Sequence, residues 1–335
     1  MLRMKLMIDS KMKVLFIGGT GIISSACTEK AIKDGVELYL LNRGESHRKA
    51  PSGAKSIVGD IRKPEEIKNL ISEHHFDAVV DWIAFTPEHI RNDIDIFRGK
   101  TDQFVFISSA SVYDTPTSYP VTEKLRAHNP FWAYSQDKIA CEEILKDAYE
   151  KDGFPVTIIR PSHTYDKTLL PVSNGYTVVD RMIRGKEVVV HGDGTSLWTL
   201  THHKDFATGF VPVLGNKNTI GETYHITGNE WLSWNQIFDL VAEAFGTEAK
   251  KIHVPSEVIN IYDSEWGAGL LGDKSVSMIF DNTKIKQMAP DLKTTIPFAE
   301  GVKELAAWYQ GDSSRQVVDD EKNQLMDRII ADWTK

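Results

Sequence analysis

The stretch Val14-Leu-Phe-Ile-Gly-Gly-Thr-Gly-Ile-Ile-Ser24 decides the fold. Its first four residues form an apolar run as long as a buried strand, and the glycines that follow end this strand in a tight turn. Cys27 and Ala31 then continue a four-residue spacing from Ile23, as on one face of a helix. This order of strand, turn and helix suits the pyrophosphate of a dinucleotide, because the glycine backbone can approach closely and the helix N-terminus offers N–H groups. The alternative is a tight turn that binds nothing. The residues expected to contact the dinucleotide here are Gly18, Thr20, Gly21, Ile22 and Ile23.

Five further apolar runs share the features of this first strand. They lack strict alternation of apolar and polar residues, so both faces of each strand are expected to be buried. Spacers of helical length separate most of them, which is typical of parallel strands joined by helices. We therefore predict an α/β protein with a Rossmann-type, doubly wound parallel sheet. The runs are Leu38–Leu41, Ser56–Val58, Ala78–Val80, Phe104–Ile107 and Val156–Ile159.

The regular alternation ends near Tyr165, and the rest of the chain has the pattern of a second lobe. Loops rich in Gly and Trp follow, with a single strand at Val188–Val190 and helical patterns at Trp234–Phe245 and Phe298–Tyr309. Tyr224–Ile226 is expected to return to the main sheet. The predicted organisation is a flexible leader at 1–11, a dinucleotide-binding domain at 12–165 with a return near 202–228, and a smaller α/β substrate lobe with C-terminal helices at 166–201 and 229–335. Met12 is an alternative start.

Length and composition limit the class of protein and its partners. A chain of 335 residues with 41% hydrophobic and 26% charged residues is an ordinary globular protein of about two domains. The net charge of −8 disfavours nucleic acid as a partner. Cys27 and Cys141 are too few for a disulfide framework and favour a reducing compartment, so we expect a cytoplasmic protein. No apolar run of about 18 residues occurs, and a membrane partner is not expected.

The end of the second strand indicates which dinucleotide is bound. The sequence there is Leu41-Asn-Arg-Gly44, without the carboxylate that usually holds the ribose 2′-hydroxyl of NAD. Asn42 does not repel a 2′-phosphate and Arg43 can bind one, with Arg48 and Lys49 as helpers, so NADP is favoured over NAD. The alternative is that Arg43 is an ordinary solvated loop residue.

A serine, a tyrosine and a lysine form the candidate catalytic group. Ser109 follows the Phe104–Ile107 strand, and Tyr134 and Lys138 are one helical turn apart on one face. A tyrosine is a poor base at neutral pH unless a nearby ammonium favours its phenolate, and Lys138 supplies that ammonium. Ser109 can hold a substrate oxygen while Tyr134 moves its proton and a hydride passes to a nicotinamide. No metal site is predicted, because His202 and His203 are adjacent and lack a third ligand.

Together these motifs resemble those of extended short-chain dehydrogenases/reductases of the NAD-dependent epimerase/dehydratase family. The resemblance extends from Lys13 to about Tyr309. It implies that Ser109, Tyr134 and Lys138 are catalytic, and that Asp60, followed by Ile61, contacts the adenosine of the cofactor. The shared features are the Gly18…Gly21 turn, Gly59-Asp60, Ser109 four before Tyr113, Tyr134…Lys138, Arg160-Pro161…Tyr165, Gly192-Asp-Gly194 and Pro297…Glu300-Gly301…Trp308.

Departures from the family pattern indicate the reaction and the substrate. Dehydratases of this pattern carry an acidic pair directly after the catalytic hydroxyl, where this chain has Ala110 and Ser111. Redox chemistry or epimerisation is therefore expected rather than elimination of water. His163 and Trp198 stand where family members bind the diphosphate of a nucleotide sugar, so we expect a sugar or polyol without that handle, contacted by Ser111, His163, Trp198 and His202. Trp231 and Trp234 are expected in the core. A nucleotide-sugar epimerase is the alternative.

A closer resemblance, over Gly192–Gly228 and the Asn42-Arg43-Gly44 turn, is to the branch that includes chloroplast stem-loop RNA-binding proteins. It raises an alternative of another class, a nucleotide-dependent RNA-binding or regulatory protein. The complete Ser109, Tyr134 and Lys138 set and the negative charge favour an enzyme. The family resemblance also implies a homodimer in which the helices near Glu88–Phe97 and Tyr134–Tyr149 pair with a second copy, although their isoleucines can equally pack inward on the sheet.

Overall fold

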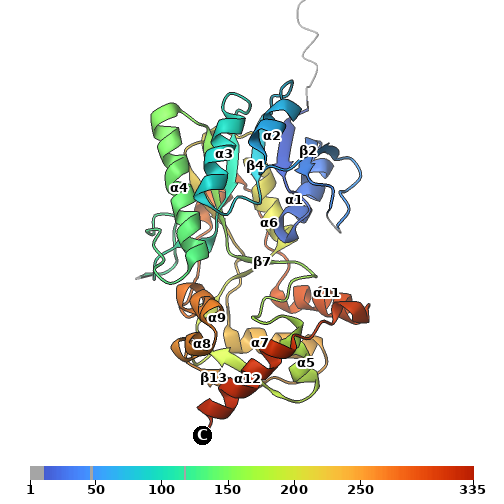
Figure 1. Ribbon diagram of the computed structural model, residues 1–335, viewed down its shortest axis with the longest axis vertical. Helices are drawn as coiled ribbons and strands as arrows, with labels where there is room; N and C mark the ends of the chain where they lie inside the picture. Colours follow the sequence, from blue (N-terminus) through green and yellow to red (C-terminus); the bar gives the residue numbers. More distant parts are fainter. Residues whose placement is uncertain (1–10, 46–47, 117) are drawn as a thin grey trace, which may run out of the picture.

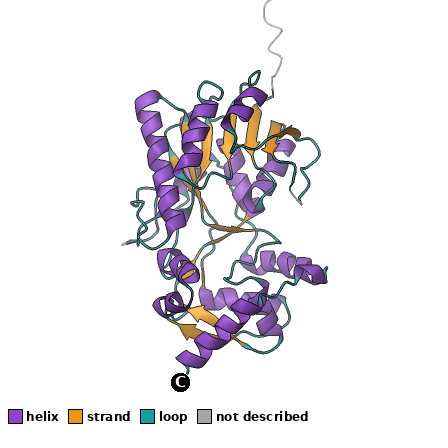
Figure 2. Ribbon diagram, viewed as in Figure 1, coloured by secondary structure: helices purple, strands orange, loops and turns teal. Residues whose placement is uncertain are grey.

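The computed structural model describes residues 11–45, 48–116 and 118–335, so the predicted leader lies almost wholly outside the described residues. The chain forms two lobes, with the sheet and its helices in one and helices with short strand pairs in the other (Figures 1 and 2). None of the helices in the described part of the chain is long and apolar enough to cross a membrane.

The larger lobe is built on a seven-stranded sheet whose paired strands all run parallel. This confirms the predicted Rossmann-type architecture. The chain also returns to the sheet after passing through the second lobe, because β11 pairs with β6 at the sheet edge. The strand order is β11 (Thr223–Ile226), β6 (Val156–Pro161), β5 (Phe104–Ile107), β4 (Ala78–Asp81), β1 (Lys13–Ile17), β2 (Glu37–Asn42) and β3 (Lys55–Val58).

Helices cover both faces of this sheet, and β1 shows why its residues are apolar without alternation. Val14 and Phe16 pack toward α1 (Ile22–Lys33), α6 (His203–Phe210) and α10 (Thr283–Met288). Leu15 and Ile17 pack toward the opposite layer, which consists of α2 (Pro64–Leu70), α3 (Pro87–Phe97) and α4 (Ala133–Asp152). All four side chains are fully buried. Each contributes about 1.5–3 kcal/mol, so β1 anchors both halves of the core.

The second lobe has its own hydrophobic core. Its helices are α5 (Tyr176–Ile183), α7 (Trp234–Ala244), α8 (Ser256–Tyr262), α9 (Ser264–Gly269), α11 (Phe298–Gln310) and α12 (Asp320–Trp333). The expectation of a single strand here is wrong, because β8 (Glu187–His191) pairs with β13 (Lys250–Val254), and β9 (Leu197–Trp198) pairs with β12 (Leu232–Ser233). The sequence Lys-Lys-Ile-His-Val of β13 conceals a strand among charged residues.

Several chain segments connect the two lobes, and we call the region where they pass between the lobes the waist. A short parallel pair, β7 (His163–Tyr165) with β10 (Leu200–His202), lies there, and Figure 1 shows β7 between the two lobes. The carboxyl ends of β5 and β6 lead toward this waist, which is where ligands bind in open parallel sheets.

Candidate active site

The glycine turn after β1 has the close approach that a phosphate site needs. Gly18 and Gly19 have φ angles of 96° and 95°, a region that side chains disfavour. A Cβ on Gly19 would come within 2.7 Å of Leu40 Cδ2. Gly21 is the N-cap of α1, and its N–H donates to Ser24 Oγ at 2.8 Å. Ser24 therefore stabilises the helix end where the family usually has a third glycine.

A groove borders this turn and brings together residues from the ends of four strands, β1 to β4. It fits the adenosine end of a dinucleotide, because the glycine backbone and the ends of β2 and β3 open onto one surface. Asp60 does not cap α2, since Lys63 occupies that position. Arg43 is exposed and lies 3.7 Å from Glu45 in an ion pair. The groove is lined by Gly18, Leu41, Asn42, Arg43, Glu45, Gly59, Asp60, Ile61, Arg62, Ile83 and Phe85.

Arg48 has a different place from the one expected. Its Nη1 lies 2.8 Å from Asp166 Oδ2, and its Nη2 donates to Thr168 Oγ1. The guanidinium thus joins the loop after β2 to the segment after β7. The buried Asp166 carboxylate holds Arg48 there, so the expectation that Arg48 helps to bind a 2′-phosphate is not supported by its contacts.

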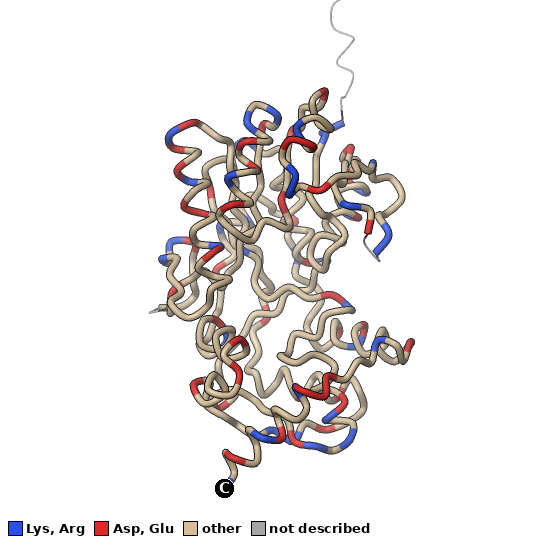
Figure 3. Tube along the Cα trace, viewed as in Figure 1, with Lys and Arg blue, Asp and Glu red and all other residues tan. Residues whose placement is uncertain are grey.

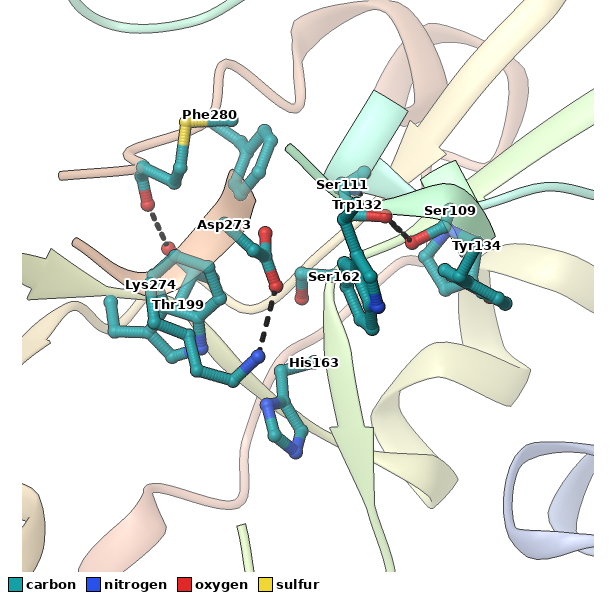
Figure 4. A pocket seen from close by; sticks show the side chains of 14 residues that line it. Ser109, Ser111, Trp132, Tyr134, Ser162, His163, Thr199, Asp273, Lys274 and Phe280 are labelled. Atoms are coloured by element: carbon teal, nitrogen blue, oxygen red, sulfur yellow. Dashed lines mark hydrogen bonds and ion pairs between the residues drawn. The ribbon is translucent and has the colours of Figure 1, made fainter. Parts of the chain in front are cut away.

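Ser109 and Tyr134 meet at one end of a cavity between the lobes (Figure 4). Ser109 Oγ lies 2.9 Å from Ser111 Oγ, which in turn lies 2.8 Å from Ser135 Oγ. Burial raises the pKa of Tyr134, and its hydrogen bond with Ser109 partly opposes this shift. The tyrosine is therefore a neutral proton donor until a nearby positive charge favours its phenolate.

Lys138 lies beneath Tyr134, on the same face of α4. Its Nζ donates to Ala84 O at 2.6 Å and to Ile107 O at 2.8 Å, and it lies 5.8 Å from the centre of the Tyr134 ring. Burial lowers the pKa of Lys138 to about 8. The structure thus brings together all three predicted catalytic side chains.

A buried ion pair fixes α4, the helix that carries Tyr134 and Lys138, to the sheet. Glu142 on α4 accepts hydrogen bonds from Arg160 Nε at 2.8 Å and Nη2 at 2.5 Å, and from Ser108 Oγ at 2.7 Å. Burial alone would raise the pKa of Glu142, but the hydrogen bonds and charge of Arg160 outweigh it and lower that pKa. This pair sets the position of α4 relative to β5 and β6, and with it the position of Tyr134.

The cavity has a volume of about 250 Å³ and includes two charged residues that the sequence did not indicate. Asp273 and Lys274 come from the helical segment Leu270–Lys274, and Lys274 Nζ lies 3.3 Å from Asp273 Oδ2. The same ammonium lies 5.3 Å from the ring centre of Trp132 and 5.9 Å from that of Trp198. The lining residues are Ser109, Ala110, Ser111, Trp132, Tyr134, Pro161, Ser162, His163, Trp198, Thr199, Asp273, Lys274, Met278 and Phe280.

Three of the four expected substrate residues line this cavity. They are Ser111, His163 and Trp198. Burial, with a smaller effect of Lys274, lowers the pKa of His163 to about 3, so the imidazole is neutral and can hydrogen bond to hydroxyls without adding charge.

His202 is not among the residues that line the cavity. It is buried at the start of α6, where its Nδ1 accepts a hydrogen bond from Lys204 N, and its Nε2 lies 3.6 Å from Glu304. The N-cap position turns the ring toward α11. Of the two tryptophans expected in the core, Trp234 is buried but Trp231 is 52% exposed, so that expectation is wrong for Trp231.

The parallel sheet, the glycine turn and the groove beside this turn, called the nucleotide groove below, define a dinucleotide-binding protein of the Rossmann class. The profile of the NAD dependent epimerase/dehydratase family matches residues 14–227, and the chain belongs to this family. The residues that resemble the catalytic residues of this family are Ser109, Tyr134 and Lys138.

Individual relatives are distant. The chain is 26% identical over 252 residues to chloroplast stem-loop binding protein of 41 kDa b from Arabidopsis thaliana, which covers 71% of this chain and 64% of that protein. It is 30% identical over 168 residues to UDP-glucose 4-epimerase from Lactobacillus helveticus, covering 44% and 51%. The chain thus spans less than two thirds of either relative. The chloroplast protein confirms the second resemblance seen in the sequence.

A solved structure shows the same fold over nearly the whole chain. UDP-glucuronic acid 4-epimerase from Bacillus cereus, in complex with UDP-glucuronic acid and NAD, superposes with a TM-score of 0.72 at 20% identity. The superposition covers 90% of this chain and 99% of that one. The second lobe therefore belongs to the shared architecture.

Proposed function

We propose that this chain is a nicotinamide-dependent oxidoreductase or epimerase that acts on a hydroxyl group of a sugar or polyol. The observation that carries the proposal is the meeting of Ser109 and Tyr134 at one end of the cavity. Lys138 is buried next to them, with its Nζ 5.8 Å from the centre of the Tyr134 ring. In this proposal Tyr134 is a proton-transfer group next to the nicotinamide ring, which is expected near the strand ends in the Rossmann class.

Each catalytic side chain has a separate task in this proposal. A bound nicotinamide supplies the hydride acceptor or donor. Ser109 Oγ donates a hydrogen bond to the reacting oxygen and holds it near Tyr134. The Tyr134 hydroxyl takes or returns the proton of the substrate hydroxyl, and the Lys138 ammonium favours the phenolate that this exchange requires.

The residues next to Ser109 favour a reaction without loss of water. Ala110 and Ser111 line the cavity and carry no carboxyl group. Elimination next to a transient ketone needs an acid and a base besides Tyr134. Asp273 is the one carboxylate in the described lining of this cavity, and its ion pair with Lys274 gives it another role.

The charge balance of the cavity supports a neutral substrate. Lys274 is the single cation among its described lining residues, and Asp273 already pairs with it. A nucleoside diphosphate would bring extra negative charge without an unpaired cation, at a cost of several kcal/mol. The indoles of Trp132 and Trp198 suit contact with the C–H surface of a sugar ring, and His163 suits its hydroxyls.

NADP is our proposed cofactor, with NAD as the alternative. Asn42 and Arg43 line the groove at the end of β2, and Arg62 lies in the same groove. The Arg43 guanidinium can bind a 2′-phosphate, whereas Arg62 Nη2 donates to Ile83 O at 2.5 Å. Glu45, which pairs with Arg43, opposes this preference and must release the guanidinium when the phosphate binds.

The protein is proposed to act as a cytoplasmic homodimer. Cys27 and Cys141 are buried free thiols, as in a reducing compartment. The groove between α3 and α4 has Arg91 and Arg98 on one side and Asp147 on the other, which suits pairing with a second copy about a two-fold axis.

Calorimetry with nucleotides and sugars tests the proposal. Cofactor-loaded protein is titrated with UDP, dTDP, GDP and CDP, and in parallel with free sugars, sugar phosphates and polyols. We expect a free sugar or polyol to bind and to be turned over, with Ser109→Ala losing turnover but retaining cofactor. Micromolar binding of a nucleoside diphosphate would overturn the neutral substrate and favour a nucleotide-sugar epimerase.

A further inference from the structure

Two carboxyl groups lie in the core directly behind the catalytic lysine. Asp81 ends β4 and Asp93 lies in the middle of α3, and both residues are fully buried. Asp81 Oδ1 accepts hydrogen bonds from the N–H groups of Ile83 at 2.6 Å and of Ala84 at 2.8 Å. One oxygen of the pair is thus well satisfied, and it shapes the chain just after β4.

The other three oxygens have no ordinary donor. Asp81 Oδ2 and both oxygens of Asp93 have no hydrogen-bond donor among the described residues. The two carboxyl groups are within hydrogen-bond reach of one another, and burial together with the neighbouring Asp81 carboxyl raises the pKa of Asp93. Two ionised carboxylates have no hydrogen to share, so a hydrogen bond between them needs a proton on one of the two.

The surrounding charges are consistent with a single negative charge on the pair. Arg62 lies near Asp93 and lowers its pKa slightly, while the Cys141 thiol on α4 is buried with its pKa raised, so that it stays neutral. His89 on α3 has its pKa lowered by burial and also stays neutral. One carboxylate is therefore balanced nearby, whereas a second buried charge would cost several kcal/mol.

Hydrogen bonds through the backbone of Ala84 connect the carboxyl pair to Lys138. The Ala84 N–H donates to Asp81, and the Ala84 carbonyl accepts from Lys138 Nζ at 2.6 Å. The negative charge of Asp81 also raises the pKa of Lys138 against the effect of burial. Any shift of Asp81 thus moves both the acceptor and the electrostatic support of the ammonium.

We propose that Asp93 is a positioning residue that carries a proton, donates it to Asp81, and thereby holds the Ala84 carbonyl and the Lys138 ammonium in place. The proposal rests on the proposed catalytic function of Lys138. Asp93 itself does not contact substrate or cofactor. Its proton is a fixed hydrogen-bond donor in the resting protein and takes no part in the transfer to Tyr134.

Infrared spectroscopy of the whole protein tests the shared proton without a substrate. Wild-type protein at pH 7 is expected to show the carbonyl band of a protonated carboxylic acid that shifts when aspartate is labelled with carbon-13. The difference spectrum between wild type and Asp93→Asn is expected to contain this band. A difference spectrum without this band overturns the proposal.

Two matched variants test the link to Lys138. Asp93→Asn keeps a donor of the same shape, so cofactor affinity and the spectroscopic titration of Tyr134 should change by less than about twofold and 0.3 pH units. Asp93→Val removes the donor, and we expect at least tenfold weaker cofactor binding and a titration of Tyr134 at higher pH. Equal behaviour of the two folded variants would overturn the positioning role.

Unchanged turnover in Tyr134→Phe, with the infrared band retained, would instead refute the proposed function and leave the shared proton intact.

Discussion

Burial moves the pKa values of Tyr134 and Lys138 in opposite directions. It raises the pKa of the phenol and lowers that of the ammonium to about 8. Below about pH 8 the lysine is charged and the tyrosine is neutral. In this state Tyr134 can donate its proton to the substrate oxygen when the substrate is reduced. As the pH rises through that value, Lys138 loses the charge that favours the phenolate.

Tyr134→Phe is expected to lower turnover by about 100-fold or more while cofactor affinity changes little, because the ring stays and the acid–base group is lost. The measurement pairs steady-state kinetics on the substrate found by calorimetry with cofactor titration. Tyr149→Phe, at the far end of the same helix, is the control and should leave turnover unchanged. Normal turnover in Tyr134→Phe would contradict the catalytic assignment.

Arg43→Ala tests the cofactor preference at the same scale. We expect NADPH to bind about tenfold or more weakly, since a charged contact with the 2′-phosphate is lost, and NADH to change by less than about twofold. Arg184→Ala is a suitable control, because this arginine is equally exposed but lies in the second lobe. Equal losses for both cofactors would show that Arg43 does not read the ribose.

Prediction from sequence was limited by what a single residue reveals of its surroundings. Tyr134 and Lys138 stand one helical turn apart, so their meeting follows from helix geometry alone. Asp273 and Lys274 lie in a segment without periodicity, and only the folding of the second lobe brings them to the cavity. His202 was predicted in the substrate site from its side-chain chemistry alone. In the structure it is the N-cap of α6, and this position sets the direction of its ring.

At the scale of elements, the β1–turn–α1 unit depends on a glycine with no space for a side chain. A Cβ on Gly19 meets Leu40 at 2.7 Å and has an unfavourable φ. We expect Gly19→Ala to cost about 2–5 kcal/mol from overpacking and backbone strain together. Gly35→Ala is the matched control: its φ is 88° with open space around it, so it should cost about 1–2 kcal/mol. Chemical denaturation measures both, and equal losses would mean that Leu40 moves aside.

The junction of α4 with β6 makes a pH-dependent contribution to stability. Glu142→Gln leaves the Arg160 charge buried without its partner, and we expect a loss of about 3–5 kcal/mol. Because the pKa of Glu142 is lowered in the folded state, its contribution is complete above the ordinary value of 4.5 and is lost as the pH falls through the lowered pKa. The difference in unfolding free energy between wild type and variant should therefore stay constant from pH 7 to about 4.5 and narrow below it. A constant difference at lower pH would contradict this.

Elements with one clear periodicity were predictable, and those with mixed patterns were not. The buried strands of the main sheet appear as apolar runs because both faces are covered. β13 is a half-exposed edge strand, and its lysines and histidine hide the pattern. Two isoleucines considered for a dimer contact, Ile94 and Ile144, pack on the core of the sheet and also line the groove between α3 and α4.

At the scale of the whole molecule, light scattering is expected to give twice the mass of one chain. The proposed contact between copies is the groove between α3 and α4, where Ile94 and Ile144 lie among charged residues. Arg91→Glu should therefore weaken the dimer, while Arg184→Glu in the second lobe should not. The mass of a single chain for wild type would refute the dimer.

Charge over the whole molecule bears on the RNA-binding alternative. Lys and Arg alternate with Asp and Glu along both lobes (Figure 3), and the net charge is −8. Binding to RNA draws on many phosphate contacts and weakens steeply with salt. The similarity to the chloroplast stem-loop binding protein is one of sequence, and the absence of RNA binding stays a prediction.

The repeated crossing of the waist has a consequence for how this protein can change during evolution. The second lobe is assembled from separate segments, and β11 joins the main sheet after the first of them, which contains α5, β8 and β9, and before the rest of the lobe. No single cut and splice can therefore exchange the lobe for another one. New substrate preferences must arise by point substitutions around the cavity, so recombination between distant relatives is a poor route to new specificity here.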